Sequence, residues 1–267
     1  MEENIHILEE QAKNIRRDVV KMIHDAKSGH PGGSLSCVDI LVAVYSKMNL
    51  NLGEDSRRID KFVLSKGHAA PAYYAMLSQK GFIDHSELFT LRKIDSHLEG
   101  HPCNKINGVD VSSGSLGQGL SIANGMALSK KINNKEGKVF CLCGDGEIEE
   151  GQIWEAMMTS NKYKLNNLIL IIDKNGLQID GTTVEVKNIN NLEEKVKSFG
   201  FNVLSVDGHD IKELINAIDS SEKSELPTCI IAKTIKGKGV KFMENKVEWH
   251  GKALTDEELE LALNDLR

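Results

Sequence analysis

A strand-like run at 138–143 and an all-apolar run at 168–172 constrain the fold more than any other feature of the 267-residue chain. The segment between them, 151–163, has the pattern of a helix. Continuous Ile, Leu and Val strands that are separated by a helix are typical of a parallel sheet covered by helices on both faces. The sequence therefore predicts an α/β fold.

Other patterns extend this prediction along the chain. Further strands are expected at 61–65, 202–206 and 228–233, and further helices at 5–27, 37–48, 71–79, 86–91, 117–131, 211–221 and after a capping box formed by Thr255 and Glu258. Residues 94–116 show no period, and a loop of that length in a compact domain is usually functional. No repeat or low-complexity linker interrupts the chain, so we expect one domain over residues 1–267.

Small residues recur every four positions in the helix expected at 117–131, at Gly119, Ala123 and Ala127. One face of this helix can therefore approach another backbone closely. Close packing in the core and a contact with another subunit both remain open at this point.

Charge and cysteine content narrow the class of protein. The net charge of −6 argues against a nucleic-acid surface, because phosphate backbones are bound by clustered Lys and Arg. Five cysteines form no disulfide framework, and Cys141 and Cys143 are expected to be buried structural residues. There is no signal-peptide pattern and no apolar run of membrane-spanning length, so we expect a cytoplasmic protein.

Polar residues follow the two central strands where each one ends. Gly144-Asp145-Gly146 follows the first, and Asn175 follows the second. Ligands of open parallel sheets bind beyond the carboxyl ends of the strands, so on neighbouring strands Asp145 and Asn175 would reach one point. Their oxygens, a backbone carbonyl, two phosphate oxygens and a water would satisfy Mg²⁺, and N–H groups near Gly146 suit a diphosphate. Singly, both are ordinary turn residues; together they predict a metal-bound diphosphate.

Four of the nine histidines lie in Gly- or Pro-broken contexts at expected element ends: Ser-Gly-His30-Pro, Lys-Gly-His68-Ala, Glu-Gly-His101-Pro and Trp-His250-Gly. Histidine carries protons near neutral pH and donates to phosphate. A zinc site is the alternative, but no two of the four histidines have the spacing of zinc ligands. We expect them to converge on one large ligand, whereas His209 is interpreted as part of a helix start.

Residues 233–239 combine lysine and glycine without the spacing of a phosphate-binding loop. We interpret this segment as a basic, flexible loop that carries His250 toward the ligand. A simple solvated loop is the alternative.

Together these motifs resemble those of the transketolases, and within that family the amino-terminal half that some members encode as a separate subunit. The resemblance covers nearly the whole chain. Its motifs are Ser-Gly-His-Pro-Gly at 28–32, Val-Leu-Ser-Lys-Gly-His at 63–68, Gly-His-Pro at 100–102, Gly-Ser-Leu-Gly-Gln-Gly at 114–119, Gly-Asp-Gly-Glu-Ile-Glu-Glu-Gly at 144–151, the strand end at Asn175 and Trp-His-Gly at 249–251. The chain departs from many single-chain members at Ser115, where they have proline, and at Lys174.

The resemblance implies thiamine diphosphate as the cofactor, held with Mg²⁺ or another divalent cation such as Ca²⁺. The implied metal ligands are Asp145, Asn175 and the backbone carbonyl of Leu177. The implied cofactor-binding residues are His68, Gly146 and His250 at the diphosphate, Gly114, Ser115 and Leu116 at the aminopyrimidine, Asn175 through the metal, and Glu150 in a carboxylate network at the subunit contact. The implied catalytic residues are His30, His101 and His250, with His30 and His101 facing the hydroxyls of the substrate.

The resemblance also implies a partner. In the family, the glutamate that activates the aminopyrimidine belongs to a second domain, whereas this chain ends at Arg267. We therefore expect a second subunit that carries the pyrimidine-binding and carboxy-terminal domains, in a dimer of heterodimers. The implied reaction is transfer of a two-carbon ketol unit from a ketose (phosphate) to an aldose (phosphate).

Other readings of the function stay open on the sequence alone. One is a subunit like 1-deoxyxylulose-5-phosphate synthase or a 2-oxo acid dehydrogenase, and another is a non-catalytic assembly subunit. The sugars are also open, between the pentose phosphate pathway and a specialised pathway with non-standard sugars.

Overall fold

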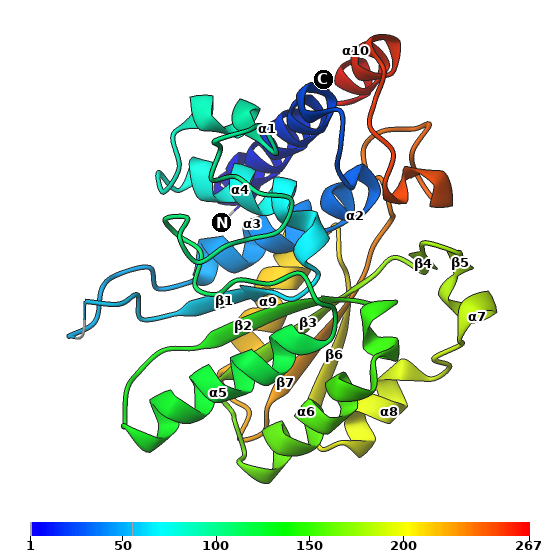
Figure 1. The fold of residues 1–267 in the computed structure, drawn as a ribbon. Coiled ribbons are helices and arrows are strands. Elements are labelled where there is room, and N and C mark those ends of the chain that lie inside the picture. The colour runs from blue at the N-terminus through cyan, green and yellow to red at the C-terminus, as the bar shows by residue number, and fades with distance from the viewer. Residues whose placement is uncertain (1, 55) are drawn as a thin grey trace.

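A five-stranded sheet, all of whose strands are parallel, lies at the centre of the protein (Figure 1). The structure is a computed structural model and describes residues 2–54 and 56–267. In spatial order the strands are β1 (Lys61–Leu64), β2 (Val139–Gly144), β3 (Leu168–Lys174), β7 (Thr228–Lys233) and β6 (Asn202–Asp207). All five expected strands are confirmed, and β2 and β3 are neighbours, as the site prediction requires.

Helices cover both faces of this sheet (Figure 1). One face carries α1 (Glu2–Ala26), α2 (Pro31–Ser36), α3 (Val38–Lys47), α4 (Ala70–Gln79) and α9 (Ile211–Ser221), with α10 (Asp256–Asp265) packed on α1. The opposite face carries α5 (Gln118–Ile132), α6 (Gly151–Lys162) and α8 (Leu192–Ser198). The predicted α/β class, with a parallel sheet between two helical layers, is confirmed.

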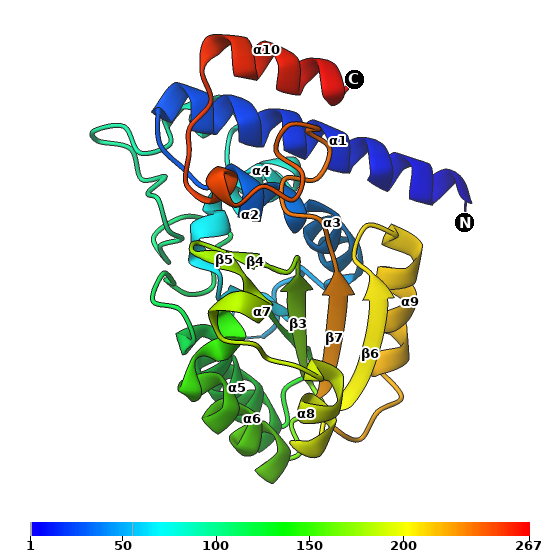
Figure 2. The ribbon, with the colours of Figure 1, turned by 90° about the vertical axis from the view of Figure 1, so that its right-hand side faces the viewer.

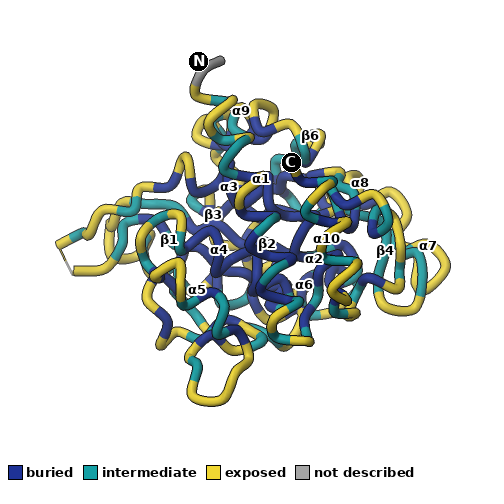
Figure 3. The backbone as a smooth tube through the Cα atoms, turned by 90° about the horizontal axis from the view of Figure 1, so that it is seen from above, coloured by how far each residue is buried: buried dark blue, intermediate teal, exposed yellow. Residues whose placement is uncertain are grey.

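The all-apolar strands divide their side chains between two hydrophobic clusters. In β3, Ile169 and Ile171 belong to the cluster on the α1 side, whereas Leu168, Leu170 and Ile172 belong to the cluster on the α5 side. Side chains alternate between the faces of a strand, so a strand that is buried on both sides must be apolar at every position. Figure 3 shows the buried residues concentrated in these central elements.

Several short elements escape the sequence-based prediction. These are the short helices α2, α7 (Thr183–Val186) and α8, the 3₁₀ helices η1 (Gly67–Ala69), η3 (Glu147–Glu149) and η4 (Val247–His250), and a small hairpin of β4 (Leu177–Gln178) and β5 (Gly181–Thr182). The segment predicted as a helix at 86–91 is a 3₁₀ helix, η2 (His85–Thr90). Figure 2 shows the hairpin beside the carboxyl end of β3.

Residues 91–117 contain neither helix nor strand, as expected, but are held at several points. The buried carboxylate of Asp110 accepts hydrogen bonds from the Phe62 N–H (2.9 Å) and the Lys61 amine (3.1 Å) at the start of β1. Farther along, the Tyr74 hydroxyl donates to the His101 carbonyl (3.0 Å). The long loop therefore has a defined path over the sheet edge.

The small residues of α5 pack inside the chain. Gly119, Ala123 and Ala127 are all buried, and the Gly119 N–H donates to the Ser65 hydroxyl at 3.1 Å. Of the two alternatives for this face, the structure shows close packing in the core. No helix in the described part of the chain is both long enough and apolar enough to cross a membrane.

We predict that Gly119→Ala destabilises the protein although alanine favours helices. The added Cβ would lie 2.8 Å from the Ser65 Cα and closer still to its hydroxyl. Helix α5 would have to move away from the sheet, at a cost of about 1–3 kcal/mol in the free energy of unfolding. Urea denaturation followed by circular dichroism measures this change.

The matched control is Gly125→Ala in the same helix, where no atom lies within 4 Å of the added Cβ. It should be neutral or stabilising by up to about 1 kcal/mol. Equal effects at the two positions would contradict the role assigned to the close approach.

Candidate active site

The carboxyl ends of β2 and β3 place Asp145 against the turn at 175–177. The Asp145 N–H donates to the Asp173 carbonyl (3.2 Å), which extends the β2–β3 pairing by one residue. The Asp145 carboxylate then accepts from the N–H groups of Gly146 (3.0 Å) and Gly176 (2.5 Å). The Asn175 amide oxygen accepts from the Leu177 N–H at 3.1 Å. The structure thus brings Asp145 and the turn that contains Asn175 and Leu177 to one place.

The donor set at this place consists of oxygens, and it fits a divalent cation of the Mg²⁺ or Ca²⁺ type. Asp145 is buried, and burial followed by the nearby Asp173 raises the pKa of its carboxyl to about 6. A cation beside Asp145 would therefore relieve a real electrostatic cost. Within residues 2–54 and 56–267, no three His, Cys, Asp or Glu side chains form a metal-binding group, so this set depends on amide and carbonyl oxygens.

Three of the four predicted histidines form a cluster. The rings of His30, His68 and His250, which we call the histidine cluster, have centroids 5.3–5.6 Å apart. They come from the start of α2, from η1 and from η4 respectively. Segments far apart in the chain are therefore brought together at one point above the sheet.

The histidine cluster is uncharged at neutral pH. Burial, followed by nearby positive charge, lowers the pKa of His30 to about 4, lowers that of His250 to about 3 and places that of His68 well below its ordinary value. The His30 Nδ1 is also buried and has no hydrogen-bond partner among the described residues. An unpartnered buried nitrogen of this kind fits a ligand that supplies its partner.

His101 is on the long loop, close enough to the histidine cluster for its charge to contribute to the lowered pKa of His30. Its exposed ring packs on Gly114, where an added Cβ would lie 3.1 Å from the ring. Burial and then the Arg92 charge lower the pKa of His101. Ser115 and Leu116 follow as exposed residues.

Glu150 is exposed, and its side chain lies against Gly117, the residue that precedes α5. An added Cβ at Gly117 would lie 2.9 Å from the Glu150 Cβ. The described contacts join neither Glu150 nor His101 directly to Asp145.

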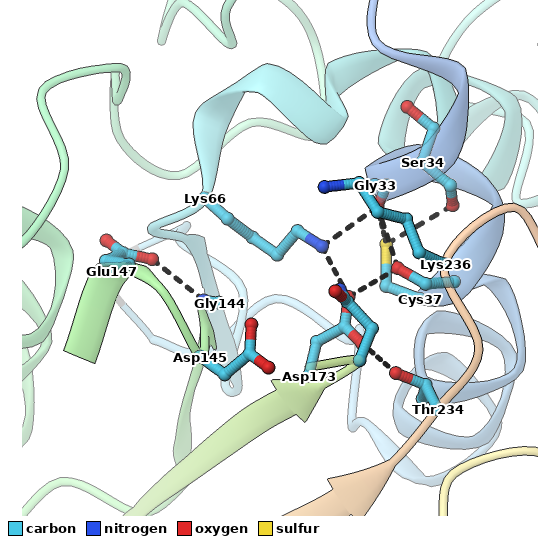
Figure 4. Close-up of polar contacts among 12 residues, drawn as sticks. Gly33, Ser34, Cys37, Lys66, Gly144, Asp145, Glu147, Asp173, Thr234 and Lys236 are labelled. Atoms are coloured by element: carbon cyan, nitrogen blue, oxygen red, sulfur yellow. Dashed lines mark hydrogen bonds and ion pairs between the residues drawn. The ribbon is translucent and has the colours of Figure 1, made fainter. Parts of the chain in front are cut away.

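Sequence reasoning missed a buried ion pair below the site, between Lys66 and Asp173 (Figure 4). The Lys66 amine also donates to the Gly33 carbonyl (2.9 Å), and Asp173 accepts from the hydroxyls of Ser36 (2.6 Å) and Thr234. Burial alone would lower the pKa of Lys66, but Asp173 outweighs it and raises that pKa above its ordinary value. The signal in the sequence was the position of these two residues: Lys66 directly follows the strand expected at 61–65, and Asp173 directly follows the strand expected at 168–172.

A second buried network fixes the turn before α5. Glu147 accepts from the Ser65 hydroxyl and from the N–H groups of Gly117 (2.9 Å) and Gly144 (3.0 Å). This one carboxylate therefore joins the ends of β1 and β2 to the start of α5. Its position inside the Gly-Asp-Gly-Glu motif was the only signal in the sequence.

The prediction of a flexible loop at 233–239 is wrong. Lys236 is buried, with 1% of its surface exposed, and its amine lies 2.7 Å from the His250 Nδ1 and 3.3 Å from the Leu177 carbonyl. Burial and the neighbouring Lys66 lower the pKa of Lys236 to about 8. The Gly237 N–H donates to the Gly32 carbonyl (3.0 Å), so this segment is fixed to α2 and adds a cation to the site.

We predict that Lys66→Met strongly destabilises the chain. The change leaves the buried Asp173 carboxylate without its cation, which costs about 3–5 kcal/mol in the free energy of unfolding. Chemical denaturation at pH 7 measures the loss. The control is Lys197→Met, which removes an exposed pair with Glu193 (2.7 Å) and should change stability by no more than about 0.5 kcal/mol. A small effect at both positions would contradict this account of the buried pair.

Known proteins that are similar to this chain belong to the same family as the one its sequence motifs resemble. Residues 7–266 match the family model described as transketolase, thiamine diphosphate binding domain. One apulose-4-phosphate transketolase subunit, from Phocaeicola vulgatus, is 39% identical over 266 residues, covering 98% of this chain and 94% of that protein. The 6-deoxy-6-sulfo-D-fructose transketolase subunit SqwG of Clostridium sp. (strain MSTE9) is 39% identical over 265 residues, covering 97% of this chain and 96% of that protein.

Single-chain transketolases match along only part of their length. Transketolase of Homo sapiens is 40% identical over 256 residues, which are 95% of this chain and 41% of that protein. The crystal structure of transketolase from Campylobacter jejuni superposes with a TM-score of 0.91 at 36% identity, covering 98% of this chain and 43% of that chain. This chain therefore spans about two fifths of the length of these single-chain relatives. The resemblance seen in the sequence is confirmed: the chain belongs to the transketolase family and corresponds to its thiamine diphosphate-binding domain.

Proposed function

We propose that this chain is the cofactor-binding subunit of a two-subunit transketolase, which transfers a two-carbon ketol unit from a ketose to an aldose. The observation that carries the proposal is the convergence of Asp145, the 175–177 turn and the histidine cluster, which Lys236 links through the Leu177 carbonyl and the His250 Nδ1. Membership of the transketolase family supports the reaction class and weighs against a non-catalytic role.

In this proposal, Asp145, the Asn175 amide oxygen and the Leu177 carbonyl bind Mg²⁺ or another divalent cation such as Ca²⁺. The metal, the Gly146 N–H, His68, His250 and the newly identified Lys236 hold the diphosphate. Gly114, Ser115 and Leu116 lie against the aminopyrimidine. When bound, thiamine diphosphate supplies the carbon nucleophile that accepts the ketol unit.

His30, His101 and His250 are assigned to the substrate by the family resemblance, and the lowered pKa of each ring suits this role. A neutral imidazole has one N–H donor and one free acceptor nitrogen, so it can bind a sugar hydroxyl and exchange a proton with it. His30 and His101 take this role, and His250 shares it while its Nδ1 is fixed by Lys236 at 2.7 Å. The low pKa values of His30 and His250 keep both rings uncharged across the physiological pH range.

The partner proposal is supported by the two relatives that match along nearly their whole length, because both are named as subunits. We propose a partner with the pyrimidine-binding and carboxy-terminal domains, in a dimer of heterodimers, with Glu150 at the contact between subunits. The five free cysteines support a reducing compartment such as the cytoplasm.

The same relatives favour specialised substrates over the common pentose phosphates. One is named for apulose-4-phosphate and the other for 6-deoxy-6-sulfo-D-fructose, and both of these sugars carry an anionic group. We therefore propose an anionic, non-standard sugar as the favoured substrate, with the pentose phosphates as the alternative.

The metal assignment is tested by Asp145→Ala. Loss of the carboxylate should abolish metal-dependent binding of thiamine diphosphate, measured by calorimetric titration with and without Mg²⁺. Asp180→Ala, on the exposed tip of the β4–β5 hairpin, is the control and should bind normally. Normal metal-dependent binding by Asp145→Ala would refute the assignment.

The substrate assignment is tested by His101→Ala in the assembled enzyme. Binding of thiamine diphosphate should remain largely intact, whereas turnover should fall by roughly 10²–10⁴-fold if the imidazole carries a proton in the reaction. An unchanged turnover would show that His101 does not face the substrate.

The requirement for a partner is tested by assaying ketol transfer with and without the second chain. The purified chain should bind thiamine diphosphate weakly and show no turnover. Addition of the partner should strengthen the binding and produce turnover. Robust transfer by the chain alone would refute the two-subunit proposal.

A further inference from the structure

His209 lies between β6 and α9, and its side chain is directed toward the core. Its Nδ1 is 2.7 Å from the Asp39 carboxylate of α3, and its Nε2 accepts a hydrogen bond from the Ile235 N–H at 2.8 Å. The interpretation of His209 as a simple helix-start residue is therefore incomplete. The N-cap of α9 is Asp210, whose side chain accepts from the Glu213 N–H at 2.9 Å.

The two contacts fix the tautomer of the ring. A backbone N–H can only donate, so the His209 Nε2 that faces Ile235 must be unprotonated. The proton of the neutral ring is then on Nδ1, where it is donated to Asp39. Each ring nitrogen has one defined partner, and a flipped ring would satisfy neither.

Asp39 is itself held firmly. Its two oxygens accept from the guanidinium of Arg16 in α1, at 2.6 and 3.0 Å, and both side chains are buried. His209 is thus anchored at one end to a buried bidentate ion pair between α1 and α3. Its other end reaches the segment that follows β7.

That segment carries Lys236 into the site. Ile235, the partner of His209, immediately precedes Lys236, whose amine contacts the Leu177 carbonyl and the His250 Nδ1. On either side, the Thr234 N–H donates to the Lys174 carbonyl (3.0 Å) and the Gly237 N–H donates to the Gly32 carbonyl (3.0 Å). The bond from Ile235 to His209 lies between these two, at the residue that sets the direction of the Lys236 side chain.

We propose that His209 is a positioning residue, which holds the Ile235 amide so that Lys236 is directed at the diphosphate end of the cofactor site. The ring does not touch the ligand and acts only through residues 235 and 236. Such an anchor matters because a lysine has four rotatable side-chain bonds, and its amine stays in place only if the backbone below it is fixed. The inference rests on the proposed function for its consequence in cofactor binding, but not for the backbone effect.

Two substitutions separate the two bonds of the ring. In His209→Asn the side-chain amide reaches about as far as Nδ1, so it keeps a donor to Asp39 and loses the acceptor for Ile235. In His209→Gln the side-chain oxygen reaches about as far as Nε2, so it keeps the acceptor for Ile235 and loses the donor to Asp39. His85→Asn is the control, because the shorter side chain loses the contact of the His85 Nε2 with Asp18 (3.1 Å), made by an exposed ring that has no described contact with Lys236.

The first measurement is amide hydrogen exchange of the full chain, resolved over residues 233–240, without any ligand. We expect His209→Asn to accelerate exchange at Ile235 by about three- to tenfold, the range for one lost buried hydrogen bond. His209→Gln and the control His85→Asn should stay within about twofold of the natural chain at Ile235, which is below the effect of one such bond. Equal acceleration in the Asn and Gln variants, or none in the Asn variant, overturns the proposal.

The second measurement is the affinity for thiamine diphosphate with Mg²⁺ in the chain assembled with its partner subunit. We expect His209→Asn to weaken binding about three- to tenfold, corresponding to the same single bond, and His209→Gln to weaken it less. If His209 acts through Lys236, the His209→Asn effect should disappear in a Lys236→Met background. An unchanged effect in that background overturns the route through Lys236.

The outcomes distinguish this inference from the proposed function. If the natural chain fails to bind thiamine diphosphate while exchange at Ile235 behaves as expected, the proposed function fails and the anchoring of the 234–237 segment stands. If binding is normal in every variant, the function stands and the positioning role of His209 fails.

Discussion

Two buried carboxylates at neighbouring strand ends, Asp145 and Asp173, determine the electrostatics of the whole carboxyl edge. Asp173 is neutralised by Lys66, and two hydroxyls complete its hydrogen bonds. Asp145 has backbone N–H partners, but burial, followed by the nearby charge of Asp173, still raises its pKa to about 6, so its negative charge is only partly stabilised. The remaining imbalance favours a cation at Asp145 rather than at Asp173, although the two residues are joined by a backbone hydrogen bond.

An acidic chain faces a difficulty in binding an anion, and the site resolves it locally. The overall charge is −6, and the histidine cluster contributes no charge because burial keeps its rings neutral. What remains is a small number of directed donors: imidazole N–H groups, backbone N–H groups and one lysine amine with a lowered pKa. Directed donors in a buried setting bind more selectively than a diffuse positive surface, because each demands a matching acceptor.

The sequence predicts the elements well where burial dictates composition, and less well where contacts join distant segments. The strands at 168–172 and 228–233 were predictable because both of their faces are covered. A strand that is apolar on both faces carries no information about its neighbours, so the position of β7 between β3 and β6 could not be predicted. Asp145 and Asn175 were predictable from their position after two strands. Lys66, Lys236 and the contacts of His209 were not, because their partners are separated from them by 107, 59 and 170 positions along the chain. The two-residue strands of the β4–β5 hairpin are too short to show any period.

The hydrogen bond from the Lys236 amine to the Leu177 carbonyl bears on how a metal can bind at this carbonyl. In many small metalloproteins the metal is required for folding, since ligand groups that repel one another or lack partners cannot be assembled without it. Here the amine gives the carbonyl a partner in advance, while backbone N–H groups do the same for the Asp145 carboxylate. A metal that binds the Leu177 carbonyl must therefore either displace the Lys236 amine or share this oxygen with it, since a carbonyl oxygen has two lone pairs.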